Sequence, residues 1–113
     1  MKKIKAIIQP FMVEKVLAAL DAIEDLPGVT ISEISGWGRL PERREAHDVK
    51  HGGHGLTKKV KLEIVVRDGL VDQVVEVIAA SAHTGNAGDG KIFVSGVDGA
   101  LRIRTGESDD EAI

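Results

Sequence analysis

The segment Leu62-Glu63-Ile64-Val65-Val66 decides the fold, because it repeats the pattern of an earlier segment of the same chain. Ile4-Lys5-Ala6-Ile7-Ile8 also has a charged residue in second place and apolar residues elsewhere. Short apolar runs of this length predict β-strands. The match therefore indicates two similar halves within one chain.

The repeat continues beyond the strands. At the same sequence offset, residues 13–20 correspond to residues 71–78, and both segments carry apolar residues at helical spacing. Pro27-Gly28 and the helix-capping residue Asp68 then suggest where these elements begin and end. In chain order we expect a strand at 4–8, a helix at about 11–25 ended by Pro27-Gly28, strands at 29–37 and 59–66, a helix from its N-cap Asp68 to about Ala82, and a strand at 91–95.

Two such halves predict an α+β fold, a ferredoxin-like βαββαβ sandwich with a mostly antiparallel four-stranded sheet and both helices on one face. A single domain over residues 1–113 suits this length. Adjacent strand residues such as Ile7 and Ile8 are both apolar, so the face without helices also needs cover. We expect self-association to supply it, the alternative being a carboxyl-terminal strand.

Composition excludes several classes of protein. The absence of cysteine removes disulfides and thiolate metal sites. A formal charge of −3, with Trp37, Phe11 and Phe93 as the aromatic residues, argues against a nucleic-acid groove. The apolar runs are too short for a membrane span and the amino terminus does not resemble a signal peptide, so we expect no membrane insertion and a cytoplasmic location.

A glycine-rich turn precedes the last predicted strand. Gly85, Gly88 and Gly90 lie just before Lys91. Glycine lets successive backbone N–H groups converge on an anion, and a nearby ammonium neutralises its charge. The glycines lead into a strand, so this turn is not a P-loop. We predict a phosphate cradle, the alternative being an ordinary glycine-rich connection.

Arg102 and Arg104 strengthen the prediction of a nucleotide site. They alternate with Leu101 and Ile103, which predicts an extended segment with both guanidinium groups on one side. Paired guanidinium groups bind phosphate oxygens well. The tail that follows spans residues 105–113, and its acidic stretch over residues 107–111 is expected to be a solvated end.

The connection over residues 39–58 is far longer than a hairpin needs. We expect a protruding loop that is mobile until a ligand or partner orders it. Its residues His47, His51 and His54 would share one face of a helix and could then bind zinc, copper or nickel. Neighbouring glycines oppose that helix, so a flexible polar loop is the alternative.

Several motifs resemble those of the PII signal-transduction proteins. They are Gly36-Trp37-Gly38-Arg39, residues 59–66, Thr84-Gly85, Gly88-Asp89-Gly90-Lys91-Ile92-Phe93-Val94 and Arg102-Ile103-Arg104-Thr105-Gly106-Glu107, and the likeness spans essentially the whole chain. The resemblance implies a homotrimer with ATP or ADP bound in clefts between neighbours. It also implies that the loop over residues 39–58 docks on a target protein.

The resemblance also implies which residues bind the nucleotide. An adenosine pocket would be lined by Thr30, Gly36, Trp37, Gly38, Glu63 and Val65. The phosphates would be held by Gly88, Asp89, Gly90, Lys91, Arg102 and Arg104, with Thr84 and Gly85 in the same turn and Arg39 and Lys59 at the base of the long loop.

Departures from the family pattern concern the second effector. Leu40 stands where nitrogen-regulatory members carry a glutamine used with magnesium and 2-oxoglutarate, although Lys59 matches the lysine that pairs with 2-oxoglutarate. We therefore expect little response to 2-oxoglutarate, while Mg²⁺ as a companion of ATP is left open. The loop also has no tyrosine, which excludes the nucleotidylylation of a tyrosine that serves as a control in the family.

These features indicate a divergent branch that acts on a transporter or an enzyme. The leading interpretation is a non-enzymatic sensor. The alternative is a metal-responsive module that uses the loop histidines and is linked to metal transport. A slow ATPase is a third interpretation, which we disfavour because no pair of metal-holding carboxylates accompanies Glu63 and Asp89.

Overall fold

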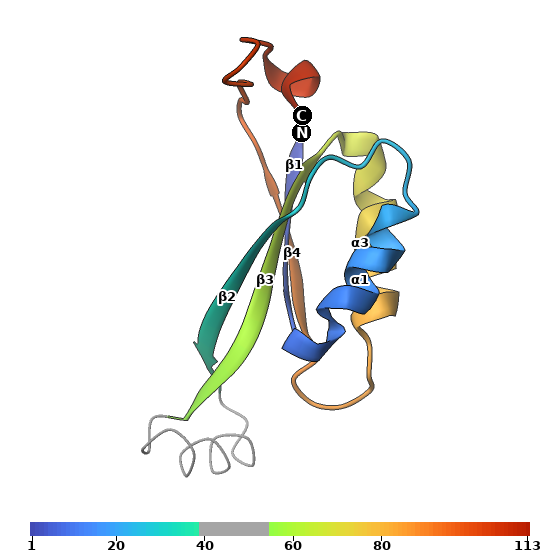
Figure 1. The fold of residues 1–113 in the computed structure, drawn as a ribbon, viewed down its shortest axis with the longest axis vertical. Coiled ribbons are helices and arrows are strands. Elements are labelled where there is room, and N and C mark those ends of the chain that lie inside the picture. The colour runs from blue at the N-terminus through green and yellow to red at the C-terminus, as the bar shows by residue number, and fades with distance from the viewer. Residues whose placement is uncertain (39–54) are drawn as a thin grey trace.

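The computed structural model of the chain describes residues 1–38 and 55–113. Its sheet has the strand order β2-β3-β1-β4, and every neighbouring pair is antiparallel. Two helices cover one face of the sheet (Figure 1), so the predicted ferredoxin-like α+β fold is confirmed. The elements are β1 (Lys2–Ile8), the 3₁₀ turn η1 (Pro10–Met12), α1 (Val13–Asp21), β2 (Thr30–Trp37), β3 (Leu56–Val66), the 3₁₀ turn η2 (Asp68–Leu70), α3 (Val71–Ala82), β4 (Gly90–Gly96) and the 3₁₀ helix η3 (Asp109–Ala112).

The internal repeat extends to the backbone that joins each strand to its helix. The turns η1 and η2 occupy equivalent positions, and their last residues have nearly the same conformation. Met12 has φ −94° and ψ −6°, and Leu70 has φ −98° and ψ −10°. The similarity of the two halves therefore includes the strand-to-helix connections as well as the elements.

The hydrophobic core lies between the sheet and the helices. Alternate residues of the two central strands point toward the helices, as period two requires. One stripe of each helix packs on them. The core consists of Ile4, Ala6, Ile8, Val16, Leu20, Ile23, Val60, Leu62, Ile64, Val66, Val74, Ile78 and Ala82.

Helix α1 is shorter at its carboxyl end than predicted. It ends at Asp21, and the N–H group of Ile23 donates to the carbonyl of Leu20 at 3.0 Å, a tight 3₁₀-type closure. This turn accompanies burial of Ile23, which is 7% exposed. Asp25 then has a φ of +61°, which no helix can accommodate. The helix therefore stops before Pro27 can end it.

Asp68 does not cap its helix as predicted. Its carboxylate accepts a hydrogen bond from the Met1 ammonium group at 2.9 Å, and no side-chain cap is made at this end of α3. That hydrogen bond is the main reason why the pKa of Asp68 lies below its ordinary value. The carboxylate thus joins the start of β1 to the turn after β3.

Strands β2 and β3 continue beyond the rest of the sheet. Strand β3 begins at Leu56, so residues 56–58 of the predicted loop belong to a strand paired with Ser35, Gly36 and Trp37. Strand β1 ends at Ile8, opposite Val60. In the described chain, residues 34–37 and 56–59 are therefore paired only with each other, and we call this projection the ribbon (Figure 1).

The sheet face away from the helices, here called the open face, is more polar than predicted. It carries Ile7, Ile34, Val65 and Phe93, but Lys3, Lys5, Lys59, Lys61, Glu63 and Lys91 share it. Among residues 1–38 and 55–113, no strand follows β4 to cover this face. No helix in those ranges is long and apolar enough to cross a membrane.

Candidate functional site

The glycine-rich turn, here called the cradle loop (residues 84–90), joins α3 to β4. Gly85, Gly88 and Gly90 have φ values of +88°, +94° and +108°, a region that favours glycine. At Gly90 the close backbone approach excludes any side chain, since a Cβ atom would lie 1.7 Å from the carbonyl oxygen of Ile7. The glycines thus have a structural reason that is independent of the predicted ligand.

A carboxylate organises the cradle loop from within. Asp89 accepts hydrogen bonds from the N–H groups of Thr84 at 2.7 Å and Gly85 at 3.0 Å, and from the Thr84 hydroxyl group. The bond from that hydroxyl is the main reason why the pKa of Asp89 is lowered. Two of the predicted anion-binding N–H groups are therefore engaged by Asp89. A phosphate would have to use the later residues of the loop.

Lys59 reaches the cradle loop from the ribbon. Its ammonium group donates a hydrogen bond to the carbonyl oxygen of Gly88. Lys91 lies at the start of β4, opposite Ile7 of β1. A cavity of about 260 Å³ lies beside it, lined by His83, Asp89, Gly90 and Lys91 together with apolar residues of β1, α3 and β4. The fold therefore brings Lys59, Asp89 and Lys91 to one end of the sheet.

A second cavity, of about 350 Å³, is lined by Thr30, Glu63 and Val65, which are three of the residues predicted to form the adenosine pocket. Glu63 forms ion pairs with Lys3 at 3.3 Å and Lys61 at 3.4 Å. The hydrogen bond from Lys3 is the main cause of its lowered pKa. Sequence reasoning missed four further lining residues, which are Lys3, Pro27, Gly28 and Ile113. The alternation of β1 could have indicated Lys3, but no pattern indicates Ile113.

The two predicted phosphate-binding arginines do not lie on an extended segment. The N–H group of Arg102 donates to the carbonyl of Glu107, and that of Gly106 donates to the carbonyl of Arg102, both at 2.8 Å. Gly106 has a φ of +76°, so it reverses the chain, and Arg104 lies in the resulting turn. Turn geometry therefore overrides the period-two alternation that predicted a strand.

The carboxyl-terminal tail is solvated as predicted, since residues 105–111 are exposed, but it is also folded. It forms η3. The guanidinium group of Arg67 donates to the carbonyl of Asp110 at 3.2 Å, and that of Arg102 donates to the carbonyl of Ala112 at 3.3 Å. These contacts place Ile113 beside the cavity that contains Thr30, Glu63 and Val65.

One chain does not bring all the predicted phosphate-binding groups together. Strand β4 spans seven residues, about 20 Å at the usual rise per residue. The cradle loop precedes this strand, and the turn with Arg102 and Arg104 follows it at the opposite end of the sheet (Figure 1). A triphosphate group is shorter than this separation.

The remaining predicted residues lie on the ribbon or beyond it. Gly36 pairs with Thr57 and Trp37 with Leu56, so these two pairs project to opposite faces of the ribbon. Gly38 follows the last residue of β2. Arg39, His47, His51 and His54 lie outside the described residues. The rest of the chain holds no cluster of three side chains suited to a metal ion.

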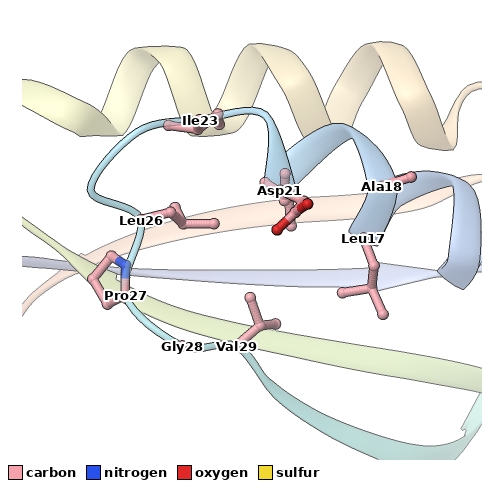
Figure 2. Close-up of a pocket in the computed structure, with 9 residues that line it drawn as sticks. Leu17, Ala18, Asp21, Ile23, Leu26, Pro27, Gly28 and Val29 are labelled. Atoms are coloured by element: carbon pink, nitrogen blue, oxygen red, sulfur yellow. The ribbon is translucent and has the colours of Figure 1, made fainter.

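A third cavity, which sequence reasoning did not predict, lies between α1 and the connection to β2 (Figure 2). It measures about 510 Å³, and Leu17, Leu26 and Val29 are among its apolar lining residues. Asp21 contributes a carboxylate. This cavity depends on the irregular path of the backbone after α1, and hydrophobic periodicity carries no information about such a path.

The sheet order and the two helices on one face define a ferredoxin-like α+β protein with a glycine-rich loop at the end of the sheet from which the ribbon projects. A family model described as Nitrogen regulatory protein P-II matches residues 1–107. The chain belongs to the PII family of nitrogen regulatory signal-transduction proteins, as its motifs predicted. PII proteins are regulatory proteins.

Individual relatives match over the whole chain. The nitrogen regulatory protein P-II of Rhizobium etli is 48% identical, and that of Synechocystis is 46% identical, each over 113 residues and 100% of both chains. The crystal structure of Arabidopsis thaliana PII bound to citrate aligns with a TM-score of 0.80 at 36% identity. That alignment covers 99% of this chain and 91% of the plant chain.

Proposed function

We propose that this chain forms a homotrimer that binds ATP or ADP in clefts between neighbouring copies. The observation that supports this proposal is that the cationic side chains lie at two opposite ends of the sheet. Lys59 and Lys91 lie at the cradle-loop end of the sheet, and Arg102 and Arg104 follow the other end of β4. A second copy can supply the groups that one copy holds too far away.

The residues at each end of the sheet have a chemistry that suits one part of a nucleotide. Lys59 and Lys91 give positive charge near the later residues of the cradle loop, where phosphate oxygens are the fitting ligand. The cavity with Thr30 and Val65 combines a hydroxyl group with an apolar wall, which suits a nucleoside. Mg²⁺ can accompany ATP, and Leu40 argues for little response to 2-oxoglutarate.

We further propose that nucleotide occupancy regulates how residues 39–58 bind a target protein in the cytoplasm. This target is a transporter or an enzyme. The predicted loop follows directly on the ribbon, whose β3 strand carries Lys59. A ligand biases such a loop only if it binds more tightly to one of its states.

Replacement of Lys91 tests the nucleotide site. Lys91→Ala is expected to weaken ATP binding about tenfold or more, because a charge-assisted contact to phosphate is lost. Isothermal titration calorimetry measures the change. Lys15→Ala removes an exposed lysine from α1 and is expected to leave affinity unchanged. Equal affinity of the Lys91 variant and the wild type would contradict the proposed site.

A further inference from the structure

The cavity between α1 and the connection to β2, here called the α1 cavity, lies apart from the proposed nucleotide site. Its volume of about 510 Å³ falls within the range of roughly 300–1,000 Å³ that is usual for small-molecule sites. None of its described lining residues is one that we assign to the nucleotide. The α1 cavity is therefore a separate candidate for a ligand.

Most of the wall of the α1 cavity is apolar. Leu17 on α1 faces the same space as Leu26 and Val29 of the connection to β2 (Figure 2). Leu17 is half-buried, and in the described chain it belongs neither to the core nor to the half-buried hydrophobic side chains packed against the core. Its apolar surface is therefore available to a ligand.

Asp21 is the one charged side chain among the described lining residues. Over residues 17–29 the chain contains no lysine, arginine or histidine. Among residues 1–38 and 55–113, Asp21 takes part in no ion pair. Glu63, by contrast, pairs with two lysines. The described chain thus supplies no cation to neutralise the Asp21 carboxylate.

The end of α1 adds to the negative potential of this cavity. A helix carries partial negative charge at its carboxyl end, where a basic residue is favourable and an acidic residue is unfavourable. Helix α1 ends at Asp21 and has no basic residue in its last turn. The carboxylate and the helix end therefore attract a cation to the same place.

We propose that the α1 cavity binds a small organic cation, a primary ammonium group attached to an aliphatic or aromatic body. The ammonium group pairs with Asp21, and the apolar body lies against Leu17, Leu26 and Val29. A metal ion would leave the apolar wall unused. A neutral apolar molecule would cover the carboxylate without giving it a partner, which is unfavourable. The charge and the wall together therefore select an amphipathic amine.

The position of the α1 cavity keeps it accessible but places it beside a second cavity. Helix α1 lies on the opposite side of the sheet from the open face, so assembly through the open face leaves it uncovered (Figure 1). Pro27 and Gly28 line both the α1 cavity and the cavity with Thr30 and Val65. A test of the proposed site must therefore distinguish these two neighbours.

Titration with three probes that share one apolar body tests the site. Phenylbutylamine, phenylbutanol and phenylbutyrate carry a positive, a neutral and a negative head group at neutral pH. Each is added to the full chain without nucleotide, and NMR records the shifts of the backbone amides. Phenylbutylamine is expected to shift the amides of residues 17–26 and to bind at least about tenfold more tightly than phenylbutanol, because an ammonium–carboxylate hydrogen bond is charge-assisted. Phenylbutyrate should not bind.

Variants separate the carboxylate from the general charge of this region. Asp21→Asn is expected to weaken binding of phenylbutylamine about fivefold or more and to leave binding of phenylbutanol unchanged. Glu24→Gln is the matched control, because it removes the same charge from a nearby side chain outside the described lining. It should change the affinity for the amine by less than about twofold. Leu17→Ala should weaken binding of both probes about threefold, because apolar contact is lost.

Three outcomes would overturn the proposal. They are equal affinity for phenylbutylamine and phenylbutanol, equal effects of Asp21→Asn and Glu24→Gln, and amide shifts confined to residues 62–65 beside the neighbouring cavity. The comparison of the three probes on the wild type decides the question even if a variant fails to fold. None of these results depends on whether the chain binds ATP, so they are independent of the proposed nucleotide site.

Discussion

At the scale of single residues, the glycines of the cradle loop show how a functional motif and a structural requirement coincide. Gly90 has a φ of +108° and lies so close to β1 that a Cβ atom would overlap the Ile7 carbonyl. Its residue type therefore follows from strand pairing before any ligand is considered. Sequence alone predicted a glycine-rich turn here, but not which glycine the backbone needs most.

Gly90→Ala is expected to reduce the free energy of unfolding by about 3 kcal/mol, because it combines an unfavourable φ with a clash against rigid backbone. Urea unfolding followed by circular dichroism measures it. Gly96→Ala, at the other end of β4, has no atom within 4 Å of the added Cβ and should change stability by less than about 1 kcal/mol. Similar losses in both variants would show that the close contact with Ile7 is not the cause.

At the scale of elements, hydrophobic periodicity predicted both helices and all four strands but misplaced several ends. The ends depend on events that periodicity does not encode. Ile23 turns into the core and stops α1 early, and Leu56 finds a partner in Trp37 and starts β3 early. Gly106 reverses the segment that alternation had predicted to be extended.

The pairing of β1 with β3 carries a prediction about pH. Glu63 on β3 lies between Lys3 of β1 and Lys61, and its folded pKa is lowered below the ordinary value of 4.5. A carboxyl group with a lowered folded pKa stabilises the fold above its unfolded pKa, and this contribution is lost as the pH falls through the folded pKa. The stability of the wild type should therefore fall more steeply below about pH 4.5 than that of Glu63→Gln.

Chemical unfolding of the two proteins between pH 3 and pH 7 measures this difference. Glu14→Gln, an exposed carboxylate on α1 without an ion pair among the described residues, serves as the control and should follow the wild-type curve. Parallel curves for the wild type and Glu63→Gln would mean that the ion pairs with Lys3 and Lys61 do not contribute.

At the scale of the whole molecule, residues 1–38 and 55–113 of one chain leave one sheet face without cover. That open face carries Phe93, which is 50% exposed, beside the half-buried Ile7 and Val65. Its lysines make it less apolar than the sequence suggested. The proposed nucleotide site is a separate reason to expect a second copy. We therefore expect copies of the chain to assemble through this face.

Analytical ultracentrifugation should give a mass about three times the chain mass of 12.1 kDa. Phe93→Glu is expected to lower that mass, because it places a charge within the contact between copies. Phe11→Glu is the control, since Phe11 is 73% exposed and lies outside the sheet. A wild-type mass of a single chain, or an unchanged mass in the Phe93 variant, would contradict assembly through the open face.

The sequence by itself determined the repeat, the sheet with its two helices and the family, because these depend on local periodicity and on short motifs. Only the tertiary structure decided which of the predicted residues meet. Lys59 reaches Gly88 across the end of β1, while Arg102 and Lys91 are separated by the length of β4. The physical reason is that strand order and register set distances between residues far apart in the chain, and no local pattern encodes them.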